Sequence, residues 1–164
     1  MKGKQIAKKQ EEFLSFGALT VHLHWDTILD LDIFAIYETK EAKKDMIYFA
    51  ESGSQGKFPF IELLFDFEFS EIPVDNQQIM AISKIEVEKI WIFAWDFDAV
   101  QDGSIINFQE QKVFLEIRHP EQILLTSPED LAEGNLALLG MLQKSSSRQG
   151  FSFSNISEAR KIAL

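Results

Sequence analysis

The sequence contains no cysteine among its 164 residues. This absence excludes disulfide bonds, thiolate nucleophiles, iron–sulfur clusters and cysteine-based structural zinc sites, and it is typical of a protein in a reducing compartment. The sequence also has no stretch that approaches the roughly 20 apolar residues of a membrane-spanning helix. Residues 1–12 lack the apolar core of a secretory signal. We therefore expect a cytoplasmic protein with no membrane span.

Basic residues are few in comparison with acidic ones. The chain has 16 Lys and Arg residues against 26 Asp and Glu residues, so its formal net charge is -10. Such a charge repels phosphate backbones and anionic membrane surfaces, and we expect no nucleic-acid partner. An acidic surface can attract cations, although its simplest role is to keep the protein soluble. The charge alone identifies no metal.

Motifs of catalysis are also missing from the sequence. There is no nucleophile elbow, no glycine-rich phosphate loop and no metalloprotease helix motif. Acid–base pairs can be drawn among the 26 acids, but the sequence supplies no geometry with which to choose among them. We therefore expect a protein that binds rather than an enzyme.

Alternation of apolar and polar residues dominates the sequence. In residues 19–26, for example, Leu19, Val21, Leu23 and Trp25 point to one face of a half-buried strand. Similar stretches cover residues 29–38, 46–50, 58–69, 78–83, 89–97, 112–118 and 151–156. Many short strands separated by Gly, Pro and Ser are typical of an all-β protein. We predict an antiparallel two-sheet β-sandwich with short terminal helices, in which residues 1–16 form an arm or short helix and residues 17–164 form the domain.

Two strands have distinctive aromatic patterns. Residues 89–97 are apolar on both faces, which predicts a central strand, and its stripe of Trp91, Phe93, Trp95 and Phe97 is interpreted as core rather than as a sugar-stacking platform. Residues 58–69 contain Pro59 near their start, which favours a bent or edge strand. Exposed Phe rings on that edge would suit docking of a partner or self-association.

The last third of the chain permits two interpretations. Ser127 followed by Pro128 is an N-cap signature, and residues 131–142 are rich in helix formers. Gly134 and Gly140 interrupt this stretch, and residues 151–156 alternate as a hairpin partner would. The residues leave helix and hairpin open, while residues 157–164 have the pattern of a terminal helix.

Histidines and acids form two local groups. His22 and His24 lie on one strand face with Asp26 next, a geometry that serves zinc only when another ligand arrives from elsewhere, so a solvated sheet face is the simpler interpretation. The second group consists of Asp96, Asp98 and Asp102. We interpret it as a turn, because neither the Gly nor the bidentate Glu of a calcium loop stands at the required offset.

The order of several short motifs resembles that of the TerD-type tellurium-resistance, or stress-protein, family. The motifs are the Trp25-Asp26 end of the opening strand, Asp30-Leu31-Asp32, and residues 45–49, 75–79, 87–90 and 138–144. The resemblance covers roughly residues 18–156. The order in which these motifs follow one another is more specific to the family than any single motif. It implies two packed antiparallel sheets, a hairpin strand at residues 138–144 and a stress-response role.

The same resemblance implies a calcium site built from loop acids. Carried over to this chain, the metal ligands are Asp30, Asp32, Asp75 and Asn76. Asn76 and Gln77 stand where the family has acids, so two negative charges are lost and the expected calcium affinity is lower than in the family. The alternative that the sequence leaves open is a metal-independent protein-interaction or oligomerisation module.

Overall fold

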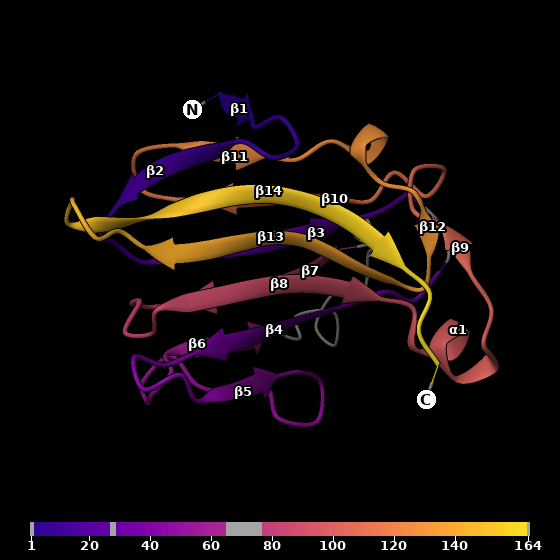
Figure 1. The fold of residues 1–164 in the computed structure, drawn as a ribbon, viewed down its shortest axis with the longest axis horizontal. Helices are drawn as coiled ribbons and strands as arrows, with labels where there is room; N and C mark the ends of the chain where they lie inside the picture. The colour runs from indigo at the N-terminus through magenta and orange to yellow at the C-terminus, as the bar shows by residue number, and fades with distance from the viewer. Residues whose placement is uncertain (1, 27–28, 65–76, 164) are drawn as a thin grey trace, which may run out of the picture.

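The computed structural model describes residues 2–26, 29–64 and 77–163, and these residues form a sandwich of two six-stranded sheets (Figure 1). The first sheet has the order β1 (Gly3–Gln5), β11 (Ile123–Leu125), β10 (Phe114–Arg118), β3 (Leu19–His24), β7 (Gln77–Ile82) and β6 (Ile61–Leu64). The second has the order β2 (Glu11–Ser15), β14 (Gly150–Arg160), β13 (Leu136–Lys144), β8 (Lys89–Trp95), β4 (Asp32–Glu38) and β5 (Lys44–Ile47). The all-β sandwich predicted from the alternation is confirmed.

Pairing within both sheets is antiparallel, with the exception of β1, which runs parallel to β11. A small two-stranded sheet joins β9 (Ile106–Asn107) to β12 (Glu133–Gly134). The helical elements are short: α1 (Phe97–Asp102) and the 3-10 turn η2 (Pro128–Asp130). No helix among the described residues has both the length and the apolar character needed to cross a membrane.

The core lies between the two sheets. In β3, Leu19, Val21 and Leu23 are buried as the alternation predicts, and in β8 the buried residues are Ile90, Ile92 and Ala94. The predicted positions of two strands are also confirmed, because β8 lies between β13 and β4, and β6 lies at the edge of its sheet. Residues 65–69 of the expected edge strand lie outside the described residues.

The hairpin interpretation of the last third is correct. Residues Leu136–Lys144 form β13, which pairs with both β14 and β8. The pairing shifts register between Leu138 and Gly140, and a Cβ atom at Gly140 would lie 2.4 Å from Cε2 of Phe153. Glycine is therefore required where the bulged strand meets the buried Phe153 ring. The Ser127 cap exists, but it begins only the 3-10 turn η2.

The expected terminal helices are wrong, because both ends of the chain form strands. At the N-terminus, β1 and β2 pair with β11 and β14, and Leu14 is completely buried. At the C-terminus, β14 continues to Arg160, which lies opposite Leu136 of β13. Pairing with a neighbouring strand outweighs the local helix propensity of these residues.

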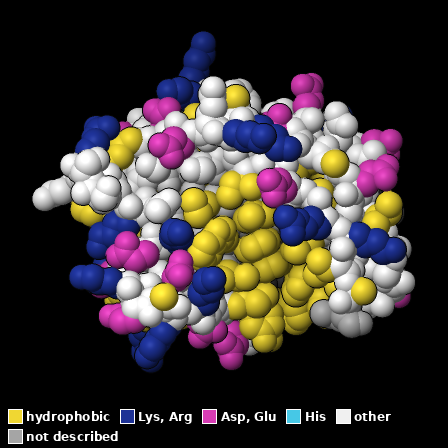
Figure 2. Space-filling model, in the orientation of Figure 1, with side chains coloured by type: hydrophobic (Ala, Val, Ile, Leu, Met, Phe, Trp, Pro, Cys, Tyr) yellow, Lys and Arg dark blue, Asp and Glu magenta, His cyan; other side chains and the backbone are white. Residues whose placement is uncertain are grey.

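The interpretation of the aromatic stripe as core is also wrong. In β8, Ile90, Ile92 and Ala94 face the core, while Trp91, Phe93 and Trp95 on the other face are only half-buried. Figure 2 shows a continuous apolar patch on this outer face of the second sheet. Both faces of β8 are apolar, so the alternation alone could not assign one of them to the core.

Candidate functional site

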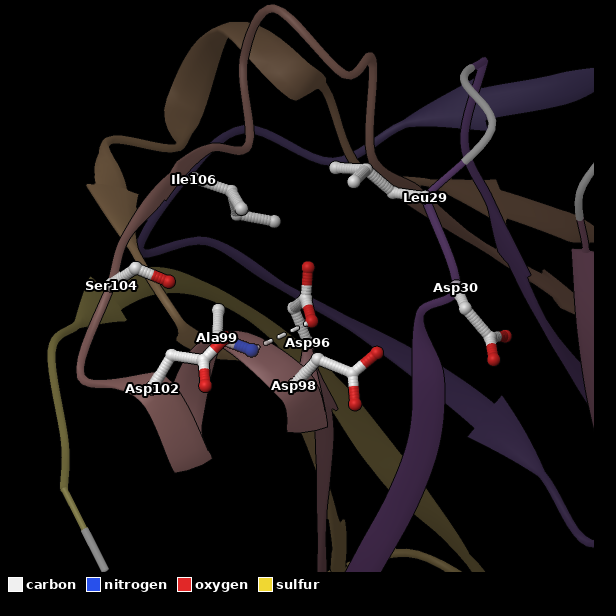
Figure 3. A pocket seen from close by; sticks show the side chains of 8 residues that line it. All are labelled: Leu29, Asp30, Asp96, Asp98, Ala99, Asp102, Ser104 and Ile106. Atoms are coloured by element: carbon white, nitrogen blue, oxygen red, sulfur yellow. Dashed lines mark hydrogen bonds between the residues drawn. The ribbon is translucent and has the colours of Figure 1, made fainter.

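Acidic residues gather at one end of the second sheet because of the pairing between β4 and β8. These strands are antiparallel, with Asp32 opposite Trp95. The residues just before β4 therefore neighbour those just after β8, which brings Asp30 to the same end of the sandwich as Asp96 and α1 (Figure 3). Two acidic segments that are distant in the sequence thus meet in space.

The local structure of α1 fixes the acids that follow β8. The Asp96 carboxylate caps the helix, since its Oδ1 accepts a hydrogen bond of 3.0 Å from the Ala99 backbone nitrogen. Gly103 ends the helix in the left-handed conformation with φ of 70°. These two caps hold the exposed side chains of Asp98 and Asp102 on the outside of one short helix.

Opposite α1, a hydrogen bond from Trp25 fixes the backbone that precedes β4. The indole Nε1 of this buried side chain donates a hydrogen bond of 2.7 Å to the Leu29 carbonyl oxygen. The bond holds the chain immediately before Asp30, whose side chain is exposed. Trp25 therefore helps to place Asp30 opposite α1.

Together these segments border an open surface hollow of about 450 Å³, called the acid hollow below. Its lining residues are Leu29, Asp30, Asp96, Asp98, Ala99, Asp102, Ser104 and Ile106. Figure 3 shows Asp98 and Asp102 on α1 and Asp30 on the facing segment, with the Asp30 carboxylate turned away from α1 in this view. Four of the eight lining side chains are carboxylates.

Asp32 lies next to the acid hollow and is held by β7. Its Oδ1 accepts a hydrogen bond of 3.1 Å from Nε2 of Gln78, and Oε1 of Gln78 accepts one of 2.8 Å from the backbone nitrogen of Ile33. Burial raises the pKa of Asp32, and the charges of Asp30, Asp96 and Asp98 raise it further, whereas the Gln78 hydrogen bond lowers it. The negative charges at this end of the sandwich therefore repel one another.

No basic side chain compensates these charges within the described part of the chain. Lys and Arg residues there form ion pairs with other acids, but with none of those at the acid hollow or with Asp32. An array of like charges without a counter-ion is electrostatically unfavourable and attracts cations. Carboxylate and hydroxyl oxygens are the hard ligands that calcium and magnesium prefer.

The structure brings only part of the predicted ligand set to this place. Asp30 lines the acid hollow, whereas Asp32 is adjacent and bonded to Gln78. Asp75 and Asn76 lie outside the described residues. The interpretation of Asp96, Asp98 and Asp102 as a turn is replaced by α1, and these residues supply the other carboxylates of the hollow. The sequence signal for this helix was the pair of capping residues, Asp96 as the N-cap and Gly103 as the C-cap.

A second feature is an aromatic ladder on the outer face of the second sheet. It runs through Phe93, Phe34, Trp95, Phe97 and Phe49, with successive ring centroids 4.8, 4.5, 5.3 and 5.5 Å apart. The last ring, Phe49, is 46% exposed. Phe34 is buried and Phe93, Trp95 and Phe97 are half-buried, so the ladder is a partly exposed aromatic surface of the kind found at interfaces.

The histidine pair lies on the outer side of the first sheet, but the prediction that this face is solvated is wrong for His22, which is only 5% exposed. His22 and His24 belong to β3, and Asp26 is exposed and forms an ion pair of 3.3 Å with Lys112 instead of joining them. None of these residues lines the acid hollow.

Comparison with known proteins offers no relative from which a ligand for either feature can be inferred. A scan against protein-family models, a search of curated proteins and a search of solved structures each gave no significant match.

Proposed function

We propose that this chain is a non-catalytic binding domain that takes a calcium ion in the acid hollow. The observation that carries the proposal is that Asp30, Asp98 and Asp102, from two distant segments, line the same hollow without a basic ion-pair partner among the described residues. The resemblance of the motif order to TerD-type proteins supports a cytoplasmic stress-response role.

The donor set favours calcium over other divalent ions. The acid hollow offers carboxylates and the Ser104 hydroxyl, with no histidine among its lining residues, and this chemistry suits a hard cation. Calcium accepts six to eight oxygen ligands in flexible arrangements, with water completing the set, whereas magnesium demands a compact octahedron. A wide hollow with exposed carboxylates therefore fits calcium better.

The affinity should be modest, because the carboxylates are exposed and few ligands are fixed. We expect a Kd of about 1 mM, which lies at the weak end of calcium modules. At about 10 mM calcium, binding would then stabilise the fold by about 1.4 kcal/mol. For a chain of this length that gain corresponds to a rise in Tm of roughly 3–6 °C.

Calorimetric titration and thermal unfolding with calcium chloride test the proposal. The wild-type chain should bind calcium and gain Tm, and Asp98→Asn and Asp102→Asn should each lose most of the gain. Glu121→Gln is the matched control, because it removes one exposed negative charge outside the acid hollow. The absence of any heat and any Tm shift would contradict calcium binding, and an undiminished response in both hollow variants would contradict the location.

The aromatic ladder favours a second candidate function, a metal-independent interaction module that self-associates through the outer face of the second sheet. Light scattering after size exclusion should detect dimers that dissociate in Phe49→Ser. Phe16→Ser is the control, because Phe16 is 50% exposed but does not belong to the ladder. A strict monomer at high protein concentration would argue against this function.

A further inference from the structure

His22, His24 and Glu116 form a cluster on the outer face of the first sheet. The two histidines are two residues apart in β3, so their side chains share one face of the sheet. Their rings lie nearly parallel, with 11° between the planes and 6.1 Å between the centroids. In the antiparallel pairing of β3 with β10, Glu116 stands directly opposite His22. The third side chain therefore comes from a strand about 90 residues later in the sequence.

The potential ligand atoms of the cluster lie close together. Nε2 of His24 is 2.8 Å from Oε1 of Glu116. One ring nitrogen of each histidine and one oxygen of Glu116 all lie within 4.8 Å of one another. In a tetrahedral zinc site neighbouring ligand atoms are roughly 3.3 Å apart, given metal–ligand distances of about 2.0–2.1 Å. The ligand atoms of the cluster therefore lie within about 1.5 Å of the spacing in a zinc site.

His22 gives an independent sign of a missing ligand. His22 is only 5% exposed, and its Nδ1 atom is buried without a hydrogen bond of standard geometry among the described residues, although the Gln77 side chain acts on the ring as a hydrogen-bond partner. The other ring nitrogen, Nε2, lies 2.9 Å from Oγ1 of Thr20. A buried polar atom without a partner costs free energy, and a bound metal or a water molecule would satisfy an imidazole nitrogen there.

Arg118 lies beside the cluster and fixes the position of the Glu116 carboxylate. Its guanidinium contacts both oxygens of Glu116 at 3.1 Å. Such outer contacts commonly position metal ligands.

From this geometry we infer that His22, His24 and Glu116 form a binding site for a divalent transition metal such as zinc. Two imidazole nitrogens and one carboxylate oxygen are a ligand set that zinc accepts with a fourth position open to water. Nitrogen ligands distinguish this site from the acid hollow, because calcium prefers oxygen. The site is thus separate from the proposed calcium function, and either can exist without the other.

Titration of the intact chain with zinc chloride tests the inference by calorimetry. The wild-type chain should bind one equivalent of zinc at this site, and His24→Gln and Glu116→Gln should each weaken its binding at least tenfold. Both replaced side chains are partly exposed, and circular dichroism should show an unchanged fold. Asp26→Asn and Asp98→Asn are the controls: each removes a nearby or competing acid outside the cluster and should leave zinc affinity unchanged.

A second measurement needs no variant. Zinc should shift the ring signals of His22 and His24 in NMR spectra, while those of His119 stay in place, because His119 bonds to the Ser15 carbonyl and the Glu121 nitrogen. No binding at about millimolar zinc, undiminished binding in both cluster variants, or loss of binding in Asp98→Asn would overturn the inference. Failure to bind calcium, by itself, would not contradict the zinc site.

Discussion

Replacing Asp32 with Asn should stabilise the protein at neutral pH when no divalent cation is present. Asp32 is half-buried, and its only described hydrogen-bond donor is Gln78 Nε2 at 3.1 Å. Burial and the charges of Asp30, Asp96 and Asp98 raise its pKa in the folded state. The Asn side chain retains an oxygen that can accept the Gln78 bond but carries no charge. The substitution therefore removes the repulsion between Asp32 and the neighbouring acids and keeps the hydrogen bond between β4 and β7.

The expected gain in the free energy of unfolding is the difference between the charge repulsion that is removed and the hydrogen-bond strength that is lost. A pair of like charges about 4 Å apart repels by about 1 kcal/mol in water and by more near a protein surface. Against this, a hydrogen bond to a charged group is stronger than a neutral one by roughly 1 kcal/mol. Because burial and three neighbouring acids oppose the charge, we expect a net gain on the order of 1 kcal/mol, and thus a Tm rise of roughly 2–4 °C.

The pH dependence provides the sharper criterion. A carboxyl group whose pKa is raised on folding binds its proton more tightly in the folded state, so its contribution to stability is greatest below the ordinary carboxyl pKa and is lost as pH rises through the raised pKa. The advantage of Asp32→Asn should therefore be full at neutral pH and vanish in acid. Thermal unfolding monitored by circular dichroism across this range measures it. A variant less stable than wild type at neutral pH, or a difference independent of pH, would refute the reasoning.

Two further substitutions test the framework around the acid hollow and the hairpin. Asn135 is fully buried, donates to the carbonyl oxygens of Ser104 and Ile162 and accepts from the Ile162 nitrogen, so Asn135→Ala should cost roughly 2–4 kcal/mol in free energy of unfolding and also weaken calcium binding. Denaturant unfolding measures that loss, and a neutral variant would contradict it. Gly140→Ala should cost about 1–3 kcal/mol, because the new methyl group meets the Phe153 ring. An equally stable Gly140→Ala chain would show that the bulge does not need glycine.

The alternation of β3 and the two-sided apolar character of β8 were sufficient to predict the sandwich and the central strand. They could not say which face of β8 is buried, because Trp91 and Ile90 are both apolar and only the position of the first sheet decides between them. Residues 157–160 read as helix because their propensity is local, whereas their pairing with Leu136–Leu138 depends on the register of the β13–β14 hairpin. Strand pairing of that kind is not visible in a short window of sequence.

The candidate sites were predictable in residue type but not in grouping. Asp30 was singled out through a family resemblance, yet its partners Asp98 and Asp102 depend on the pairing of Asp32 with Trp95, which no single segment encodes. The histidine pair was likewise visible, but its third member, Glu116, became apparent only from the pairing of β3 with β10. A site whose residues are distant in sequence can be predicted only when the register of the strand pairing is known.

A crystal structure determined in the presence of calcium tests the central claim most directly. The account predicts an ion in the acid hollow, bound by carboxylate oxygens of Asp30 and of at least one of Asp98 and Asp102, with water filling the remaining positions. Calcium density at another place, or a hollow that contains only water at about 10 mM calcium, well above the expected Kd, would contradict it.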